Sequence, residues 1–165
     1  LKPFQKVLEV GHVRFGGEAA GPAYSAQSFR LLQGYLGGQF TSMRPPGAAA
    51  GTGEVTRNHA AAVNLTTGAL LPWNPNVNGT VRALRVVGTT VYMGGAFTQV
   101  GGATHTRVAA VQATGAGAVI PAFKASASGE VFSLVASGSS LFMGGGFGTV
   151  DGATSLLRSE PQRAR

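Results

Sequence analysis

A six-residue pattern occurs three times in this chain, and it constrains the fold more than any other feature. Each copy has an aromatic or aliphatic pair, two glycines, one variable residue and a phenylalanine, at 35–40, 92–97 and 142–147. The second and third copies begin 50 residues apart, and the first and second 57. A period of this length is typical of repeat architectures, in which each copy forms one supersecondary unit packed on the next. The residues to which we assign a structural role in these units are Gly37, Gly38, Phe40, Gly94, Gly95, Phe97, Gly144, Gly145 and Phe147.

The last two copies extend well beyond the six-residue pattern. Residues 79–104 align with residues 129–154 without a gap over 26 positions. The extra length between the first and second copies lies in 43–54, which contains the run Pro-Pro-Gly-Ala-Ala-Ala-Gly. Because proline and glycine favour turns, we predict that this stretch is a long surface loop.

Each copy is predicted to consist of short strands. The segments 81–87, 91–93 and 108–111 are apolar, rich in β-branched or aromatic residues, and bounded by Gly, Asn, Thr or Pro. No stretch holds an apolar i, i+3, i+4 pattern long enough to predict a helix. Asn78-Gly79 and Gly138-Ser139 are pairs of the kind that close hairpins. The sequence therefore predicts an all-β fold.

Three or four strands in a unit of about 45–50 residues match one blade of a β-propeller. The paired glycines suit this arrangement, because they lack Cβ and let backbones approach closely where strands crowd. We predict about two recognisable antiparallel blades plus fragments. A β-solenoid is the alternative, although about 50 residues is long for one solenoid turn.

The sequence resembles the delta-60 repeat family, a bacterial β-propeller type of large secreted and cell-surface proteins. Residues 79–102 follow the first part of the family pattern, and Thr67-Gly68 with Pro72-Trp73-Asn74-Pro75 follow the last part. The resemblance implies a propeller fold and an extracellular or cell-surface location, and it implies no shared catalytic residues. The predicted organisation is an irregular segment at 1–29, repeats at 30–154 (approximately 30–62, 63–110 and 111–154) and a basic tail at 155–165.

Composition and charge argue against two classes of function, nucleic-acid binding and a membrane-spanning role. The chain has 165 residues, 44% of them hydrophobic and 12% charged, with no cysteine and a net charge of +7. Residues 58–157 hold four basic and two acidic groups, so most of the excess lies towards the ends. Nucleic-acid binding requires a clustered basic surface, and the basic residues here are scattered, so we predict no nucleic-acid partner. No apolar run approaches the length of a membrane span.

The repeats contain few acidic residues and histidines that could form a catalytic site. Catalysis by paired carboxylates needs two acids held close together, and only Glu54, Glu130 and Asp151 fall in the repeats. Asp151 aligns with Gly101, which favours a role in a turn. The three histidines lack metal-ligand spacing. We predict no catalytic set, metal site or cofactor within this chain.

Two groups of residues are candidates for binding. His105 aligns with Arg57, and His59 with Arg107, so a His/Arg couple precedes a strand in two copies. These four residues predict either an anion or polar-ligand site on a propeller rim or a pair of solvated loops. Trp73, which Phe123 replaces in the next copy, is either a platform for stacking a carbohydrate or a core residue between blades.

These observations predict a non-catalytic scaffold or binding module that presents rim loops to a protein or glycan partner. We expect the chain to be part of a larger extracellular bacterial protein whose leader lies upstream and whose remaining blades complete the propeller. The alternative is a segment of a propeller-type enzyme, such as a quinoprotein dehydrogenase or a glycan-active hydrolase or lyase, with its catalytic residues outside this chain.

Overall fold

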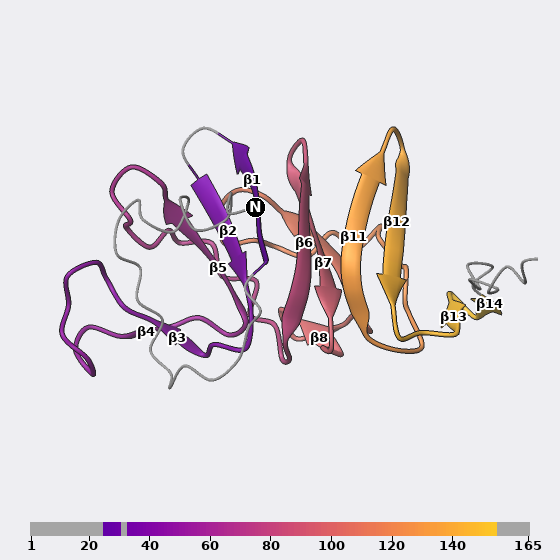
Figure 1. Ribbon diagram of the computed structural model, residues 1–165, viewed down its shortest axis with the longest axis horizontal. Coiled ribbons are helices and arrows are strands. Elements are labelled where there is room, and N and C mark those ends of the chain that lie inside the picture. Colours follow the sequence, from indigo (N-terminus) through magenta and orange to yellow (C-terminus); the bar gives the residue numbers. More distant parts are fainter. Residues whose placement is uncertain (1–24, 31–32, 155–165) are drawn as a thin grey trace, which may run out of the picture.

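Short antiparallel strands are the regular secondary structure of the described part of the chain, and the predicted all-β class is confirmed there. The computed structural model describes residues 25–30 and 33–154, and this part of the chain contains no helix (Figure 1). The predicted N-terminal segment up to residue 24 and the basic tail at 155–165 lie outside the described residues. The eight longer strands are β1 (Ser25–Arg30), β2 (Gln33–Gly37), β5 (Ala60–Asn64), β6 (Val81–Val87), β7 (Thr90–Gly95), β10 (Val108–Gln112), β11 (Val131–Ser137) and β12 (Ser140–Gly145).

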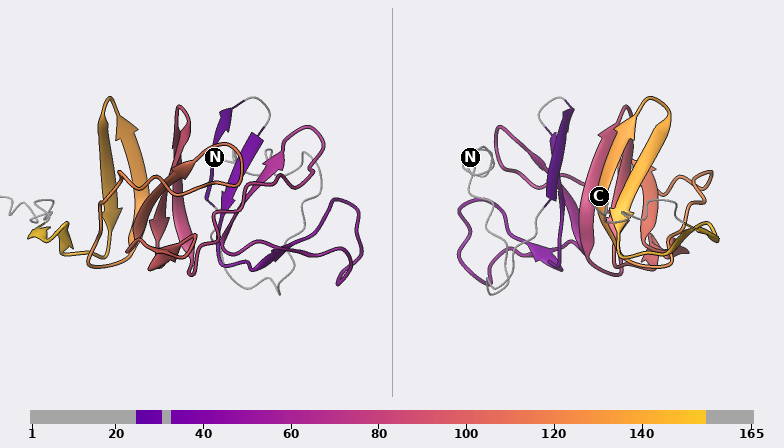
Figure 2. Two further views of the ribbon diagram at one scale, coloured as in Figure 1. Left: turned by 180° about the vertical axis from the view of Figure 1, so that it is seen from behind. Right: turned by 45° about the vertical axis from the view of Figure 1, so that its right-hand side comes forward.

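The longer strands form three sheets that stand side by side in sequence order (Figures 1 and 2). We call them the first sheet (order β1-β2-β5), the middle sheet (order β10-β7-β6) and the last hairpin (β11-β12). Three small ribbons lie near one end of these sheets. They are β3 (Ser42–Met43) with β4 (Val55–Thr56), β8 (Gln99–Val100) with β9 (Ala103–Thr104), and β13 (Thr149–Val150) with β14 (Ala153–Thr154).

The middle sheet is buried on both faces because its side chains alternate between two cores. In β7, Val91 and Met93 belong to the core shared with the first sheet, and Tyr92 packs against the core shared with the last hairpin. In β6, Leu84 faces the first of these cores and Ala83 the second. A sheet covered on both sides requires strands that are apolar almost throughout, which explains the apolar runs in the sequence.

The middle sheet and the last hairpin share one pairing register at an offset of 50 residues. Val81 pairs with Gly95 and Ala83 with Gly94. Fifty residues later Val131 pairs with Gly145 and Ser133 with Gly144, and a β-bulge follows the first pair in both hairpins. The small ribbons keep the same offset, since Gln99 pairs with Thr104 and Thr149 with Thr154.

In the first two Gly-Gly pairs, the first glycine lies where two sheets meet. A Cβ on Gly37 would lie 2.6 Å from Val81 Cγ1 in the next sheet, and a Cβ on Gly94 would lie 2.5 Å from Val131 Cγ1. The second glycine lies against backbone, because a Cβ on Gly95 would overlap the Thr80 carbonyl. The close approach predicted for the paired glycines is therefore confirmed at these positions.

Two local predictions need correction. Asn78-Gly79 does not close a hairpin; Asn78 Oδ1 instead accepts hydrogen bonds from the backbone N–H groups of Thr98 and Gln99, both at 2.9 Å. The β6–β7 hairpin turns at Gly88-Thr89, whereas Gly138-Ser139 does close β11–β12 as predicted. The second correction concerns the segment predicted to be irregular up to residue 29, because its last residues belong to β1, which begins at Ser25. The segment 25–30 contains no β-branched residue, so its pairing with β2 was not apparent from its own sequence.

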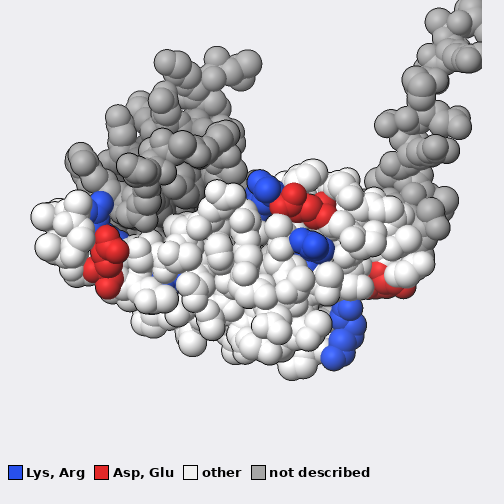
Figure 3. Space-filling model, turned by 90° about the horizontal axis from the view of Figure 1, so that it is seen from below, with Lys and Arg blue, Asp and Glu red and all other residues white. Residues whose placement is uncertain are grey.

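The described surface carries few charges. Figure 3 shows scattered cations and anions on a largely uncharged face, without a basic stripe. Within residues 25–30 and 33–154 no helix could cross a membrane.

Candidate functional site

The four predicted rim residues occupy equivalent places in two successive units. Arg57 follows β4 and His59 precedes β5, while His105 follows β9 and Arg107 precedes β10. The backbone contacts repeat as well: the N–H of Arg57 donates to the Thr41 carbonyl, and that of His105 to the Thr98 carbonyl. The structure therefore brings these residues to matching positions, each beside its own small ribbon.

His59 and Arg107 hold together the backbone of their own units. Both have a left-handed backbone, with φ of 62° and 68°. Each accepts a hydrogen bond at its carbonyl from the Gly-Gly pair, at 3.0 Å, from Gly38 to His59 and from Gly95 to Arg107. The side chains return to the same segments: His59 Nδ1 lies 3.1 Å from the Gly38 carbonyl, and Arg107 Nη1 donates to the Ala96 carbonyl at 2.8 Å. These contacts assign both residues a structural role.

Arg57 is similarly engaged. Its guanidinium donates to the Leu71 and Thr56 carbonyls, each at 2.9 Å, and partial burial lowers the pKa of the group from its ordinary value. Arg57, His59 and Arg107 are all half-buried, so these three side chains are held against the backbone and do not extend freely into solvent. All three side chains lie against backbone carbonyl groups, those of Leu71 and Thr56 for Arg57, Gly38 for His59 and Ala96 for Arg107.

His105 differs from the other three because it lines a cavity. The cavity has a volume of about 430 Å³ and lies between the end of the β8–β9 ribbon and the loop at 119–126. One wall is apolar, formed by Val119, Pro121 and Phe123. The polar groups around it are one ammonium group, one imidazole and three hydroxyls, from Lys124, His105, Thr104, Thr106 and Ser126.

The electrostatics of this cavity favour a negatively charged ligand. The pKa of His105 is lowered from its ordinary value, first by burial and second by the positive charge of Lys124. Among residues 25–30 and 33–154 no carboxylate lines the cavity itself, and the Asp151 carboxylate lies behind it, where Oδ1 accepts hydrogen bonds from the N–H and the hydroxyl of Ser126. An anion placed there would offset both effects, because it would compensate the Lys124 charge and favour the imidazolium form of His105.

Neighbouring contacts fix the walls of the cavity. The Phe123 ring meets Tyr92 of β7 edge-on, with centroids 5.5 Å apart. On the other side, Asp151 Oδ1 accepts the Ser126 N–H at 2.6 Å. Asp151 has φ of 50° in the turn between β13 and β14, where Gly101 has 58° in the equivalent turn, so its predicted role in a turn is confirmed.

Lys124 and the hydroxyls were not predicted as site residues. Lys124 takes the place of Asn74 in the preceding copy, so it breaks the repeat beside the recurring aromatic of Trp73 and Phe123. A cation next to a repeated aromatic residue is a sequence signal that indicates a binding site at Lys124. The hydroxyls gave none, because threonine and serine are frequent throughout the chain.

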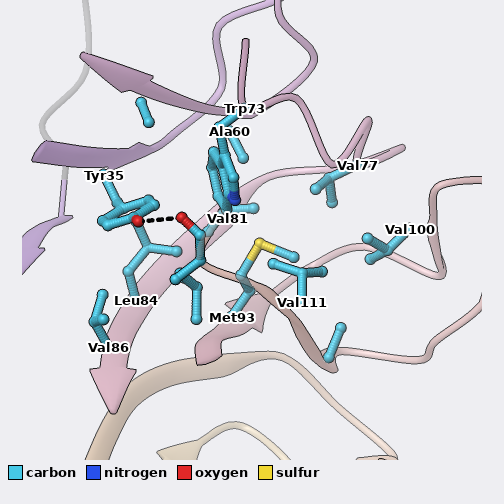
Figure 4. Close-up of a cluster of buried hydrophobic side chains, with 14 of the residues drawn as sticks. Tyr35, Ala60, Trp73, Val77, Val81, Leu84, Val86, Met93, Val100 and Val111 are labelled. Carbon is cyan, nitrogen blue, oxygen red and sulfur yellow. Dashed lines mark hydrogen bonds between the residues drawn. The ribbon is translucent and has the colours of Figure 1, made fainter. Parts of the chain in front are cut away.

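Trp73 is not a carbohydrate platform. It is only 2% exposed, meets Tyr35 edge-on at 5.0 Å and donates its indole N–H to the Gln112 carbonyl at 2.8 Å. Figure 4 shows it among the buried residues between the first and middle sheets, beside Tyr35, whose hydroxyl bonds to the Ala113 carbonyl. The stacking hypothesis for Trp73 is therefore wrong, and the alternative of core packing is confirmed.

The remaining repeat residues are also structural. Phe40 and Phe97 are buried in different cores, and Phe147 packs against the third. The acidic residues of the described chain lie apart, with separate partners: Glu54 accepts a hydrogen bond from Ser42, Glu130 pairs with Arg82, and Asp151 binds Ser126. Within residues 25–30 and 33–154, no three His, Cys, Asp or Glu side chains are grouped as a metal site would require.

Comparison with protein-family models, with curated proteins and with solved structures finds no match for this chain. The resemblance to the delta-60 repeat family therefore stays a prediction.

Proposed function

We propose that the chain is a non-catalytic β-propeller-type module of a larger extracellular bacterial protein, and that it binds a protein or glycan partner at the end of the sheets that carries the small ribbons. The cavity at His105 and Lys124 is the observation that carries this proposal. Loops that a rigid sheet scaffold holds in place are common binding sites.

The chemistry of the cavity suits a partner with a carboxylate or sulfate group. Lys124 and a protonated His105 supply positive charge, and the hydroxyls of Thr104 and Thr106 supply hydrogen bonds. Phe123 offers an apolar surface against which a sugar ring or a side chain packs. About 430 Å³ lies within the range of small-ligand sites and accommodates one such group with its neighbours.

The stack of sheets supports the propeller part of the proposal. Successive sheets pack face to face, and two of them share a register at an offset of 50 residues. Repetition of that unit around an axis is the construction principle of a propeller, which has typically four to eight blades. A structure of the full-length parent protein tests this part directly, since an open solenoid there would contradict it.

Binding is tested with ligands that differ only in charge. Glucuronate is compared with glucose, and a peptide with a free C-terminal carboxylate is compared with its amide, by NMR chemical-shift mapping. We expect shifts at His105, Thr106 and Lys124 with the charged member of at least one pair, and their loss in Lys124→Gln.

A matched control uses a cation outside the cavity. Arg85→Gln removes a charge from β6, on the middle sheet, and should leave the shifts unchanged. Equal responses to the charged and neutral ligands, or no response at His105 with any of them, would overturn the proposed binding site.

A further inference from the structure

The outer face of the last hairpin is apolar and exposed. Val135 and Phe142 form a directly opposed pair across β11 and β12, and Ser133 and Gly144 form another two positions along, so all four lie on one face. Val135 is 57% exposed and Phe142 54%. Phe132, at the bulge that borders this face, is 52% exposed. Exposed large apolar side chains that adjoin one another mark a surface that binds a partner.

The other face of the last hairpin already packs against the middle sheet. Leu134 and Met143, which also pair directly, belong to or pack against the core shared with the middle sheet. Val135 and Phe142 therefore lie on the half of a two-sided hairpin that no other part of residues 25–30 and 33–154 covers.

The middle sheet shows what covers the equivalent face there. Tyr92, which corresponds to Phe142, is half-buried and packs against the core shared with the last hairpin. Arg82, which corresponds to Phe132, pairs with Glu130 and lies over the Phe132 ring at 5.6 Å. Each position is thus covered by the sheet that follows it.

The two contacts between sheets share one geometry. At the first contact, a Cβ on Gly37 would lie 2.6 Å from Val81 Cγ1 and 3.3 Å from Leu84 Cδ1. At the second, a Cβ on Gly94 would lie 2.5 Å from Val131 Cγ1 and 3.5 Å from Leu134 Cδ1. In both, a valine and a leucine three residues apart, on the first strand of the following sheet, fill the space left by a glycine.

Gly144 is the third glycine in this series, and no such valine or leucine lies against it. The atoms nearest to its Cβ position belong to Ser133 of its own hairpin, with Oγ at 2.5 Å. We infer that the face formed by Ser133, Val135, Phe142 and Gly144 binds a further sheet of the same repeat type, whose first strand carries the Gly-x-Val-x-x-Leu pattern of 79–84 and 129–134. In this contact, the valine lies on Gly144 and the leucine lies beside it.

A second copy of this chain does not fit the same geometry. Its two Val/Leu pairs, Val81 with Leu84 and Val131 with Leu134, are already buried in its own cores. The occupant must therefore be a repeat whose valine and leucine are unpartnered. This inference does not depend on the ligand of the cavity at His105.

The test adds one repeat to the chain. A second copy of residues 105–154 is inserted between Thr154 and Ser155, which preserves the natural junction of residue 104 with 105. Because the chain has no cysteine, Val135→Cys gives a single thiol on the face in question. We expect the inserted repeat to slow labelling of this thiol about tenfold or more, since only local opening would then expose it.

Two controls separate docking from other effects. In the first, Val131→Asp and Leu134→Asp are made in the inserted copy only, and labelling of the Val135→Cys thiol should return to its original rate. In the second, the thiol is moved by Val87→Cys to an exposed position at the end of β6, where the inserted repeat should have no effect.

Three results would overturn the inference. The first is unchanged labelling at Val135→Cys with a folded insert. The second is an insert whose amides show no protection from hydrogen exchange, because docking on this face should fold it. The third is protection of the thiol without any insert that grows with protein concentration, which would make the face an interface between copies of this chain.

Discussion

Gly94 and Val131 are in direct contact across the boundary between the middle sheet and the last hairpin, although 37 residues separate them in the sequence. A Cβ on Gly94 would lie 2.5 Å from Val131 Cγ1 and 3.1 Å from Val131 Cβ. The glycine does not have positive φ, so it is the space and not the backbone conformation that excludes a side chain there.

Gly94→Ala should destabilise the fold by about 1–3 kcal/mol, because overpacking a stiff β-branched neighbour forces the sheets apart. Thermal or urea unfolding measures the change. Gly148→Ala is the control and should be close to neutral, since no atom lies within 4 Å of its Cβ position. In the double mutant Gly94→Ala with Val131→Ala, the two costs should be less than additive; strict additivity would contradict a direct contact.

Trp73→Ala should cost about 3–5 kcal/mol, in the range for truncating a buried aromatic residue. Trp73→Phe should cost less, since Phe123 takes the equivalent place in the next copy. Its remaining cost is the loss of the indole hydrogen bond to the Gln112 carbonyl. Circular dichroism melts measure both. Quenching of the native Trp73 fluorescence by added sugar would contradict its burial.

Arg107→Ala should cost about 1–3 kcal/mol, because it removes the hydrogen bond to the Ala96 carbonyl. The φ of 68° disfavours arginine and alanine alike and adds little to the difference. Arg107→Asn should cost less than Arg107→Ala, since asparagine tolerates the left-handed region better. His105→Ala is the matched comparison at the other position of the couple. Its imidazole makes no hydrogen bond within the described residues, so unfolding of this variant should be close to that of the native chain.

The lowered pKa of His105 gives stability a defined dependence on pH. Protonation of His105 is less favourable in the folded state than in the unfolded state. The full stability of the folded state is therefore reached above the unfolded pKa of about 6.5. It is lost as pH falls through the lower folded pKa. An NMR titration should place His105 below the unfolded value, and Lys124→Gln should raise its pKa by removing the second cause. A pKa that does not move in Lys124→Gln would show that the two groups do not interact.

The sequence predicts local structure well where a residue type has one physical use. It does not predict structure that depends on tertiary contacts. Glycine at 94 and 95 predicted close approach, because no other residue leaves that space. The pair Asn78-Gly79 predicts a hairpin turn, but asparagine also binds backbone N–H groups through its side chain, and here Asn78 binds those of Thr98 and Gln99. The strand at 25–30 follows from its pairing with β2, which its own residues do not encode.

The candidate site was partly predictable for a similar reason. Alignment of the repeats located the His/Arg couples, but it could not tell a side chain that caps a carbonyl, such as Arg107, from one that lines a cavity, such as His105. That distinction depends on the loop at 119–126, whose path is fixed by the contact of Phe123 with Tyr92.

Burial of the middle sheet on both faces also determines where local unfolding begins. Opening β6–β7–β10 exposes two cores at once, whereas opening the last hairpin exposes one. Fluctuations should therefore begin at β11–β12 and reach the centre only at a free energy close to that of global unfolding. The amide protons of β7, bonded on both sides by β6 and β10, should be among the slowest in the described chain to exchange with solvent.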